Sequence, residues 1–453
     1  METVDPTTGE TIESYELWNA AQAHARAASA REAFQSWKKT AFTTRAEKMQ
    51  NLATLLEKRA PEYARLMARE MGKPLRDGIS EAEKCAWVCR YYAENAAGFL
   101  AREIIKTDAR KSFVSYQPLG PVLAVMPWNF PFWQVFRFLA PALMAGNTGL
   151  LKHAANVAGC ARAIEEVVRD AGFPENCFIN FPIDHSTAAA LIEGSDVAAV
   201  TLTGSTRAGQ SVAATAGRAL KKTVLELGGS DAYIVLADAD LEASVKTCVQ
   251  SRLINGGQSC IAAKRFIVER ELYHDFVAAF VERMRAIRMG SPFEDQSDIG
   301  PMARHDLRDE LHKQVERTIE AGARLCLGGE LPEGPGAFYP PTVLADVEPG
   351  MAAFDEELFG PVAPISCATD AEHALTLANQ SEFGLGAAIF TSDLERGEAL
   401  AEKSVEAGSV FVNSFVKSDP RLPFGGIRGS GYGRELSFFG IREFVNIKTI
   451  YVA

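Results

Sequence analysis

The stretch with the clearest chemical potential is Asn255-Gly-Gly-Gln-Ser-Cys260, a polar loop that presents one cysteine. It lies between a segment with apolar residues at helical spacing, 241–254, and an extended apolar run, 265–268. Glycines at 256 and 257 allow positive φ and a close approach of the backbone to another group. Core cysteines usually lie among apolar side chains, whereas a thiol displayed on a loop is typical of a nucleophile. Taken alone, the loop leaves the structural and the nucleophilic interpretations equally open.

Two further polar residues lie in apolar surroundings. Asn129 is flanked by prolines in Pro127-Trp-Asn-Phe-Pro131, directly after the apolar run 122–126. Its amide can donate to a developing oxyanion, although a turn-stabilising asparagine is the simpler interpretation of this motif alone. Glu226 is the one acid in the apolar strand 224–227, which ends in two glycines. Burial would raise the pKa of its carboxyl and suit it to proton transfer, while a salt-bridged glutamate fits equally well.

These residues require a scaffold, and its pattern is an alternation of strands and helices. Helical spacing covers 19–38, 44–71, 157–171, 272–287 and 307–321, and Pro61 starts a second helix within 44–71. Short apolar runs at 122–126, 197–202 and 408–413 predict strands. The alternation indicates an α/β protein with a doubly wound parallel sheet. Thr203-Gly-Ser205 opens a helix and suits a phosphate, although its spacing is not the dinucleotide fingerprint.

One helix start and one pair of cysteines complete the pattern. Ser80 with Glu83 three residues later resembles a capping box, which predicts a helix from there to about residue 100. Cys85 and Cys89 are four residues apart on that helix, but no further ligands follow at metal-binding spacing. We interpret them as packing residues, and no metal site is predicted.

The composition limits the class of protein. A chain of 453 residues is too long for one core, so two or more lobes are expected. A net charge of -11 argues against a nucleic-acid partner, and no apolar run approaches the ~18 residues of a membrane span. The N-terminus lacks the apolar core of a signal peptide, and eight scattered cysteines do not form a disulfide pattern. A cytoplasmic location is therefore predicted.

Five motifs in order carry a resemblance to a known family. They are Pro-Trp-Asn-Phe-Pro (127–131), Thr-Gly-Ser (203–205), Leu-Glu-Leu-Gly-Gly (225–229), Gly-Gln-Ser-Cys (257–260) and Glu-Leu-Phe-Gly-Pro (357–361). Together they make the sequence similar to the aldehyde dehydrogenase superfamily over essentially its whole length.

The resemblance implies NAD(P)-dependent oxidation of an aldehyde to a carboxylic acid. Cys260 would attack the aldehyde to give a thiohemiacetal, and Asn129 would stabilise the oxyanion. Hydride transfer to the nicotinamide would leave a thioester, which water would hydrolyse with Glu226 as general base. The presence of Glu226 favours hydrolytic release over transfer to coenzyme A.

The same resemblance implies a set of cofactor contacts. Lys152 would hold the adenine ribose, Ser205 the pyrophosphate and Glu357 the nicotinamide ribose, with Phe359 beside the nicotinamide. The other predicted cofactor residues are Trp128, Gly204, Leu227 and Ala155. NAD-preferring relatives often carry glutamate where this chain has Ala155, so NAD or NADP is allowed, and His153 with Lys152 would favour NADP.

For the substrate, the resemblance is strongest to short bacterial succinate-semialdehyde dehydrogenases. Arg137 and Ser418 match substrate-binding positions of those enzymes, and a guanidinium suits a terminal carboxylate. One departure is Ile254, which stands where many members have a second arginine, and the nearby Arg252 is expected to point elsewhere. The alternative role for Arg137 is a salt bridge on the helix surface or between lobes.

Other functions are kept as alternatives. A broad medium-chain aldehyde dehydrogenase would use Phe130, Phe132 and Trp133 to line an apolar pocket. A cysteine thioesterase or acyltransferase would use Cys260 without nicotinamide, and a non-catalytic protein on this fold is a third class.

The resemblance also implies a domain organisation. A Rossmann-like NAD(P)-binding domain would span 1–102 and 119–230, and a catalytic domain 231–436. A small β oligomerisation arm would combine 103–118 and 437–453. Its strands would extend a partner's sheet, which predicts a homodimer or homotetramer.

Overall fold

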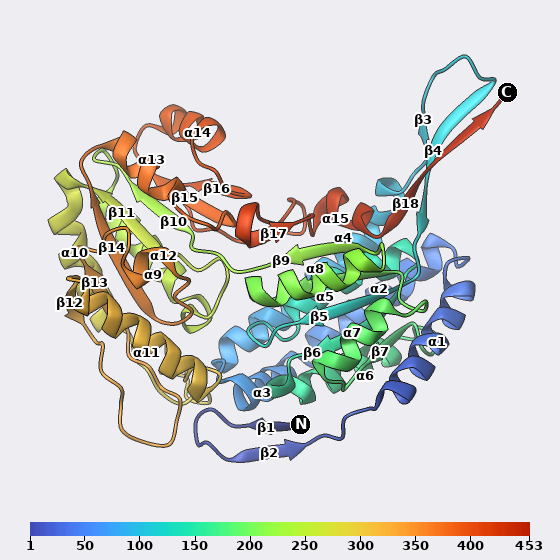
Figure 1. Cartoon of the computed structure of the whole chain (residues 1–453), viewed down its shortest axis with the longest axis horizontal. Helices are drawn as coiled ribbons and strands as arrows, with labels where there is room; N and C mark the ends of the chain where they lie inside the picture. Colours follow the sequence, from blue (N-terminus) through green and yellow to red (C-terminus); the bar gives the residue numbers. More distant parts are fainter.

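Two open α/β sheets and a projecting three-stranded arm make up the molecule, shown in Figure 1. The structure is a computed structural model that describes all residues, 1–453. The predicted α/β class with two doubly wound sheets and an arm is confirmed. No helix combines the length and the apolar character that crossing a membrane would require.

The first sheet has the strand order β17-β9-β8-β5-β6-β7. Its strands are β5 (Pro121–Met126), β6 (Thr148–His153), β7 (Phe178–Asn180), β8 (Ala199–Thr203), β9 (Lys222–Glu226) and β17 (Gly431–Tyr432). All neighbours are parallel except β17, which pairs antiparallel with β9 although it comes from the far end of the chain. The chain order runs outward in both directions from β5 and β8, so a topological switch point lies between these two strands.

Helices cover both faces of this sheet and are apolar where they meet it. They are α1 (Ala20–Trp37), α5 (Trp133–Ala145), α6 (Ala158–Asp170), α7 (His185–Glu193) and α8 (Thr206–Arg218). Every residue of α5 is buried, which explains its almost continuous apolar sequence. The polar exceptions on α5 therefore require partners within the protein.

A further helical layer packs against α5. It consists of α2 (Phe42–Lys58), α3 (Ala60–Met71) and α4 (Leu75–Phe99), and the predicted break at Pro61 is confirmed. The capping box at Ser80 is wrong, because α4 begins at Leu75 directly after Pro74 and Ser80 Oγ donates to the carbonyl of Arg76 at 3.0 Å. Cys85 and Cys89 are fully buried in the core, as predicted for packing residues.

The second sheet has the order β12-β13-β14-β11-β10-β15-β16. Its strands are β10 (Ala232–Val235), β11 (Arg265–Glu269), β12 (Arg324–Leu327), β13 (Thr342–Ala345), β14 (Val362–Ala368), β15 (Gly386–Phe390) and β16 (Ser409–Val412). Its helices are α9 (Leu241–Arg252), α10 (Arg270–Arg285), α11 (His305–Glu320), α12 (Ala352–Asp355), α13 (Ala371–Asn379) and α14 (Leu394–Lys403). Only β12 is antiparallel to its neighbour, and separate apolar cores lie on the two faces of the sheet.

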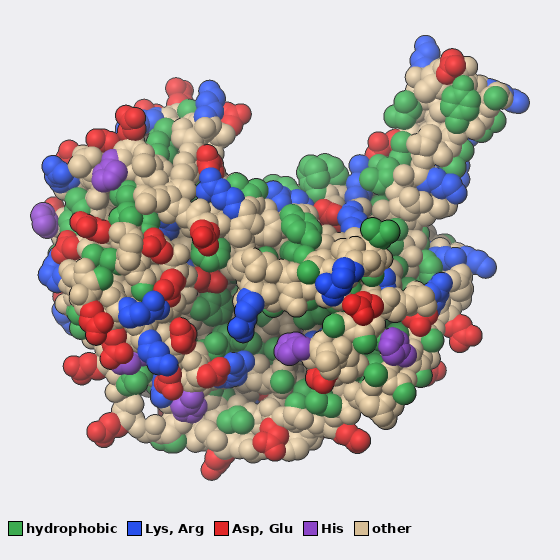
Figure 2. All heavy atoms as spheres, viewed as in Figure 1, with side chains coloured by type: hydrophobic (Ala, Val, Ile, Leu, Met, Phe, Trp, Pro, Cys, Tyr) green, Lys and Arg blue, Asp and Glu red, His purple; other side chains and the backbone are tan.

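The arm consists of β3 (Glu103–Ile104), β4 (Lys111–Pro118) and β18 (Val445–Val452), in the order β18-β4-β3. It extends away from the two sheets, and hydrophobic side chains lie on its surface in Figure 2. The helix α15 (Ser437–Glu443) leads into it and packs against α4 and α5. A separate hairpin, β1 (Glu2–Val4) with β2 (Thr11–Ser14), begins the chain.

Candidate active site

The loop that carries Cys260 has an unusual backbone. Between α9 and β11 the chain forms a short 3-10 turn, η2 (Ile254–Gly257), in which Asn255, Gly256 and Gly257 all have positive φ. A Cβ on Gly257 would lie 2.1 Å from the carbonyl oxygen of Gly360, so the position requires glycine. The predicted positive φ at both glycines is confirmed. The turn places Cys260, which is partly exposed, in the wall of a cavity.

Lys264 fixes the backbone of this loop. Its Nζ donates to the carbonyls of Ser259 at 2.8 Å and Cys260 at 2.7 Å, and it lies 3.2 Å from Oε1 of Glu357. The lysine is buried and is therefore committed to these partners. Sequence reasoning missed this residue, although a lysine at the entrance to the buried strand β11 was a visible signal.

Asn129 lies against the same loop. Its side-chain Nδ2 donates to the backbone carbonyl of Gln258 at 3.1 Å. The backbone carbonyl of Asn129 accepts from Nζ of Lys73 at 3.0 Å and from Nδ2 of Asn255 at 2.7 Å. One of the two amide hydrogens remains available beside the nucleophile loop. The structure thus joins the end of β5 to the Cys260 loop, as the oxyanion hypothesis requires.

Glu226 is buried at the end of β9, and neither of its carboxyl oxygens has a hydrogen-bond partner. Burial, and next the charge of Glu435, raise its pKa well above the ordinary value, while Arg137 opposes the shift. It is not part of the cavity wall that contains Cys260. Burial therefore favours the protonated carboxyl, which must lose its proton before it can act as a base.

The thiol of Cys260 is also held in its neutral form. Desolvation raises its pKa to about 11, and the positive charges of Arg137 and Lys264 act in the opposite direction. A proton acceptor or a further positive charge is thus needed to form the nucleophilic thiolate near neutral pH.

Arg137 of α5 forms a buried ion pair and also lines the cavity, so its role toward a substrate carboxylate stays a prediction. It forms a buried ion pair with Glu435, and its guanidinium lies 4.6 Å from the ring of Phe424. Its Nη2 donates weakly to Thr203 at 3.4 Å, while Nη1 has no hydrogen-bond partner. Because Arg137 also lines the cavity beside Cys260, the ion pair does not remove it from the site.

The expected cofactor residues gather along one sheet edge and the facing loop. Lys152 is the second-last residue of β6 and has no hydrogen-bond or ion-pair partner, and burial lowers its pKa. Ser205 is the N-cap of α8, where its Oγ accepts from the amide of Ala208 and its hydroxyl hydrogen stays free. Gly204 precedes it, and the exposed Ala155 follows β6.

The facing loop supplies the remaining contacts. Glu357 accepts from the amide of Gly229 at 3.1 Å, and the rings of Phe359 and Trp128 meet edge to face at 5.7 Å. Leu227 packs against Gly209 of α8, so it supports the helix N-terminus. An unpartnered cation, a free helix start and an acid on the opposite side fit an extended dinucleotide.

His153 does not belong to this set. Its ring is fully buried, with Nδ1 toward the carbonyl of Met126 and Nε2 2.9 Å from the carbonyl of Pro131. Burial lowers its pKa to about 4, so it is neutral at physiological pH. The expectation that His153 favours a 2′-phosphate is wrong, because the ring points into the protein below the sheet edge.

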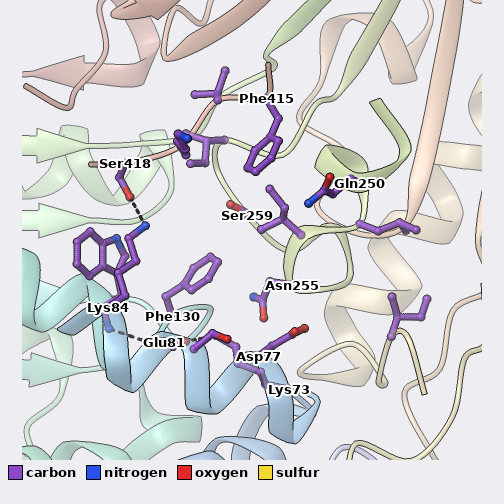
Figure 3. Close-up of a pocket in the computed structure, with 18 of the residues that line it drawn as sticks. Lys73, Asp77, Glu81, Lys84, Phe130, Gln250, Asn255, Ser259, Phe415 and Ser418 are labelled. Carbon is purple, nitrogen blue, oxygen red and sulfur yellow. Dashed lines mark hydrogen bonds and ion pairs between the residues drawn. The ribbon is translucent and has the colours of Figure 1, made fainter. Parts of the chain in front are cut away.

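A cavity of about 790 Å³ opens beside Cys260, between α4, α5 and α9 (Figure 3). Its wall contains seven basic side chains against three acidic ones, in a chain whose net charge is -11. Ser418 lies in this wall, as does Ile254. Arg252 instead donates to the carbonyls of Gly257 and Leu358, so it points elsewhere, as expected.

Lys84 is a wall residue that sequence reasoning missed. It comes from α4, and its Nζ donates to Ser418 Oγ at 2.9 Å, the contact drawn as a dashed line between them in Figure 3. The aromatic part of the wall contains Phe130 and Trp133, but Phe132 packs against Tyr63 at a ring distance of 4.7 Å. The expectation that Phe132 lines the pocket is wrong, because its side chain turns into the core.

Comparison with known proteins agrees with this geometry. The model of the aldehyde dehydrogenase family matches residues 1–450. A probable NADP(+)-dependent succinate-semialdehyde dehydrogenase of Synechocystis is 49% identical over 451 residues, which are 100% of this chain and 99% of that protein. The NAD(P)+-dependent succinate semialdehyde dehydrogenase Sad of Escherichia coli is 49% identical, covering 99% of this chain and 97% of its own.

Solved structures give the same result. The succinic semialdehyde dehydrogenase from Streptococcus pyogenes, determined in complex with NADP+, superposes with a TM-score of 0.97 at 36% identity. The match covers 100% of this chain and 99% of that one. With five motifs in order, the joined nucleophile and asparagine loops and this full-length similarity, the chain belongs to the aldehyde dehydrogenase family.

Proposed function

We propose that this protein oxidises succinate semialdehyde to succinate with NAD or NADP. The observation that carries the substrate assignment is the basic wall of the cavity beside Cys260, since the rest of the chain is acidic. A cavity enriched in one sign of charge concentrates ligands of the opposite sign. The names of the relatives from Synechocystis and Escherichia coli support the same substrate.

Three residues of the chain perform the covalent chemistry in this proposal. Cys260, once deprotonated, attacks the aldehyde carbon, and the free amide hydrogen of Asn129 donates to the oxyanion that forms. Glu226, after losing its own proton, accepts one from the water that cleaves the thioester. Lys264 keeps the Cys260 backbone fixed during these steps.

The cofactor side is proposed from the unpartnered Lys152, the start of α8 and the facing acid Glu357. Lys152 would hold the adenosine ribose or its 2′-phosphate, Ser205 and Gly204 the pyrophosphate, and Glu357 the second ribose. The walls of the cofactor site would be formed by Trp128, Phe359 and Leu227. The bound dinucleotide supplies the acceptor for the hydride removed from the substrate. Ala155 carries no acid that would repel a 2′-phosphate, so the site accepts either nucleotide.

The test is a comparison of aldehydes with both nucleotides. We expect kcat/KM for succinate semialdehyde to exceed that for butanal, an uncharged aldehyde of equal length, by at least tenfold. Arg137→Ala should reduce that ratio, and Arg137→Lys, which keeps the charge beside Glu435, should reduce it less. A ratio near one in the wild type overturns the substrate assignment, and an unchanged ratio in Arg137→Ala removes Arg137 from it.

A second candidate is a broad medium-chain aldehyde dehydrogenase. It is supported by the aromatic part of the cavity wall, which includes Phe130, Trp133, Phe415 and Phe424. Higher kcat/KM for octanal than for succinate semialdehyde would favour it.

Assembly and location are also proposals. The arm exposes Ile104, Ile447 and Tyr451, and its edge strand β18 can pair with another sheet, so we propose a homodimer or homotetramer. The domain boundaries at 102/103, 118/119, 230/231 and 436/437 stay predictions. β17 lies within the segment 231–436 but pairs with β9 of the first sheet. A cytoplasmic location likewise stays a prediction, made from the unpaired cysteines.

A further inference from the structure

Lys84 has an environment unlike that of the other basic residues around the cavity. Its Nζ contacts Ser418 Oγ at 2.9 Å and lies 4.3 Å from the ring centroid of Trp133. No carboxylate lies within ion-pair distance of it. A cation–π contact and one neutral hydrogen bond fix the ammonium in place but leave its charge uncompensated.

The other basic side chains of the wall are either in ion pairs or exposed at its rim. Four form ion pairs: Lys73 with Glu81, Arg76 with Asp77 and Asp298, Arg137 with Glu435, and Arg283 with Glu242. Lys246 and Lys417 have no partners and are exposed. Lys84 is therefore the one wall cation that is both held in a fixed position and free of an anionic partner.

We propose that Lys84 and Ser418 together form the subsite for the substrate's carboxylate, in place of the arginine absent at position 254. Ile254 lies in the same cavity wall and offers no donor. The ammonium has two hydrogens left after its bond to Ser418, and the serine hydroxyl, an acceptor in that bond, can donate its own hydrogen. A carboxylate placed between them would receive two charge-assisted bonds. This inference rests on the proposed function.

The charges around Lys84 give the subsite a pH dependence. Burial, and next the charge of Arg137, lower the pKa of Lys84 to about 8, while Cys85, Glu81 and Asp419 act in the opposite direction. The amine is therefore positive below pH 8 and loses its charge above it. A carboxylate substrate should lose affinity as the pH rises through that value, whereas an uncharged aldehyde should not.

The experiment compares kcat/KM for succinate semialdehyde and butanal in the wild type, Lys84→Met, Lys84→Arg and Lys246→Met. Lys84→Met keeps an apolar chain over Trp133 and removes the charge. We expect the ratio of the two kcat/KM values to fall about 10- to 100-fold in Lys84→Met, mainly through KM, and to be largely restored in Lys84→Arg. Lys246→Met removes the same charge at the rim and should lower the ratio several times less.

Measuring the ratio of the two kcat/KM values against pH separates carboxylate binding by Lys84 from a purely structural role of that residue. The ratio should fall about tenfold per pH unit above pH 8 in the wild type, and this decline should be absent in Lys84→Arg. Since the ratio cancels effects common to both substrates, titration of Cys260 and Glu226 does not enter it.

The possible outcomes separate this inference from the proposed function. A wild-type ratio near one overturns the proposed function whatever the variants do. A high wild-type ratio that persists in Lys84→Met overturns only the role of Lys84. Equal losses in Lys84→Met and Lys246→Met would mean general electrostatic attraction, which also overturns a direct contact.

Discussion

At the scale of single residues, burial favours the neutral forms of the site's reactive groups. Glu226 and Glu435 are buried near one arginine, and burial raises the pKa of both carboxyls. Cys260 is likewise shifted upward, to a pKa of about 11. Arg137 lowers the pKa of all three groups and Lys264 lowers that of Cys260, but neither charge offsets burial, so protonation must be ordered along the reaction.

Glu226→Gln tests the assignment of the acid to the hydrolytic step. The amide cannot accept a proton from water, so steady-state turnover should fall about 10²- to 10⁴-fold. The first turnover at Cys260 should survive, giving a burst of about one reduced nucleotide per active site in rapid-mixing absorbance. Glu402→Gln, at an exposed acid of α14, is the control. Loss of the burst would instead place Glu226 before the thioester, for example in deprotonating Cys260.

At the scale of elements, the loop between α9 and β11 depends on its glycines. Three successive residues with positive φ bring Gly257 against the carbonyl of Gly360, on the segment that also carries Glu357. This contact and Lys264 tie the nucleophile loop to the expected cofactor side. The geometry of Cys260 is thus set by packing against a segment about 100 residues away in sequence.

Gly257→Ala should destabilise the protein by at least about 2 kcal/mol. Residue 257 has a φ of 79°, which is strained for alanine, and the added Cβ would clash with the carbonyl of Gly360. Thermal unfolding followed by circular dichroism should show a lower midpoint, together with reduced kcat. Gly217→Ala is the matched control, since that glycine lies in α8 with nothing within 4 Å of the added Cβ. It should leave the midpoint unchanged or raise it. Equal midpoints for the two variants would contradict this account of the loop.

Local sequence patterns predicted many helices and strands, but they failed for segments that are both short and completely buried. Ala232–Val235 and Thr342–Ala345 are strands of four residues, too short for a periodic signal, and only their place inside a parallel sheet makes them strands. The start of α4 was misplaced for a related reason. Ser80 and Glu83 have capping-box spacing, but Pro74 lets the helix begin a turn and a half earlier.

At the scale of the molecule, the arm is the feature without a function inside one chain. Ile447 is 63% exposed and Ile104 68% exposed, on strands that project beyond both sheets. Exposed apolar side chains beside an open strand edge are typical of an interface. The end of the chain also returns through β17 and Glu435 to the first sheet, so the arm is joined to the site by one short segment.

Ile447→Glu should shift the protein toward smaller species, measured as molar mass by light scattering over a range of concentrations. A buried charge at an interface costs more than the apolar contact it replaces. Leu394→Glu, at a leucine of α14 with 64% exposure, is the control and should keep the wild-type mass. The same mass in both variants would exclude the arm as the interface.

The sequence by itself determined the family, through five motifs that occur in the family's order. Motifs such as Gly257 to Cys260 are contiguous, so residue type and backbone requirement can be read together. The tertiary structure decided the rest, because it depends on contacts between distant segments. Lys84 contacts Ser418, which is 334 positions away in sequence, and Arg137 of the first sheet's layer pairs with Glu435 near the end of the chain. The ring of His153 is buried against the carbonyl of Pro131, although its neighbour Lys152 belongs to the expected cofactor site. No local pattern in the sequence shows which of several lysines and arginines will lack an anionic partner in the folded protein. The lack of such a partner is what distinguishes Lys84 as the candidate for binding the substrate's carboxylate.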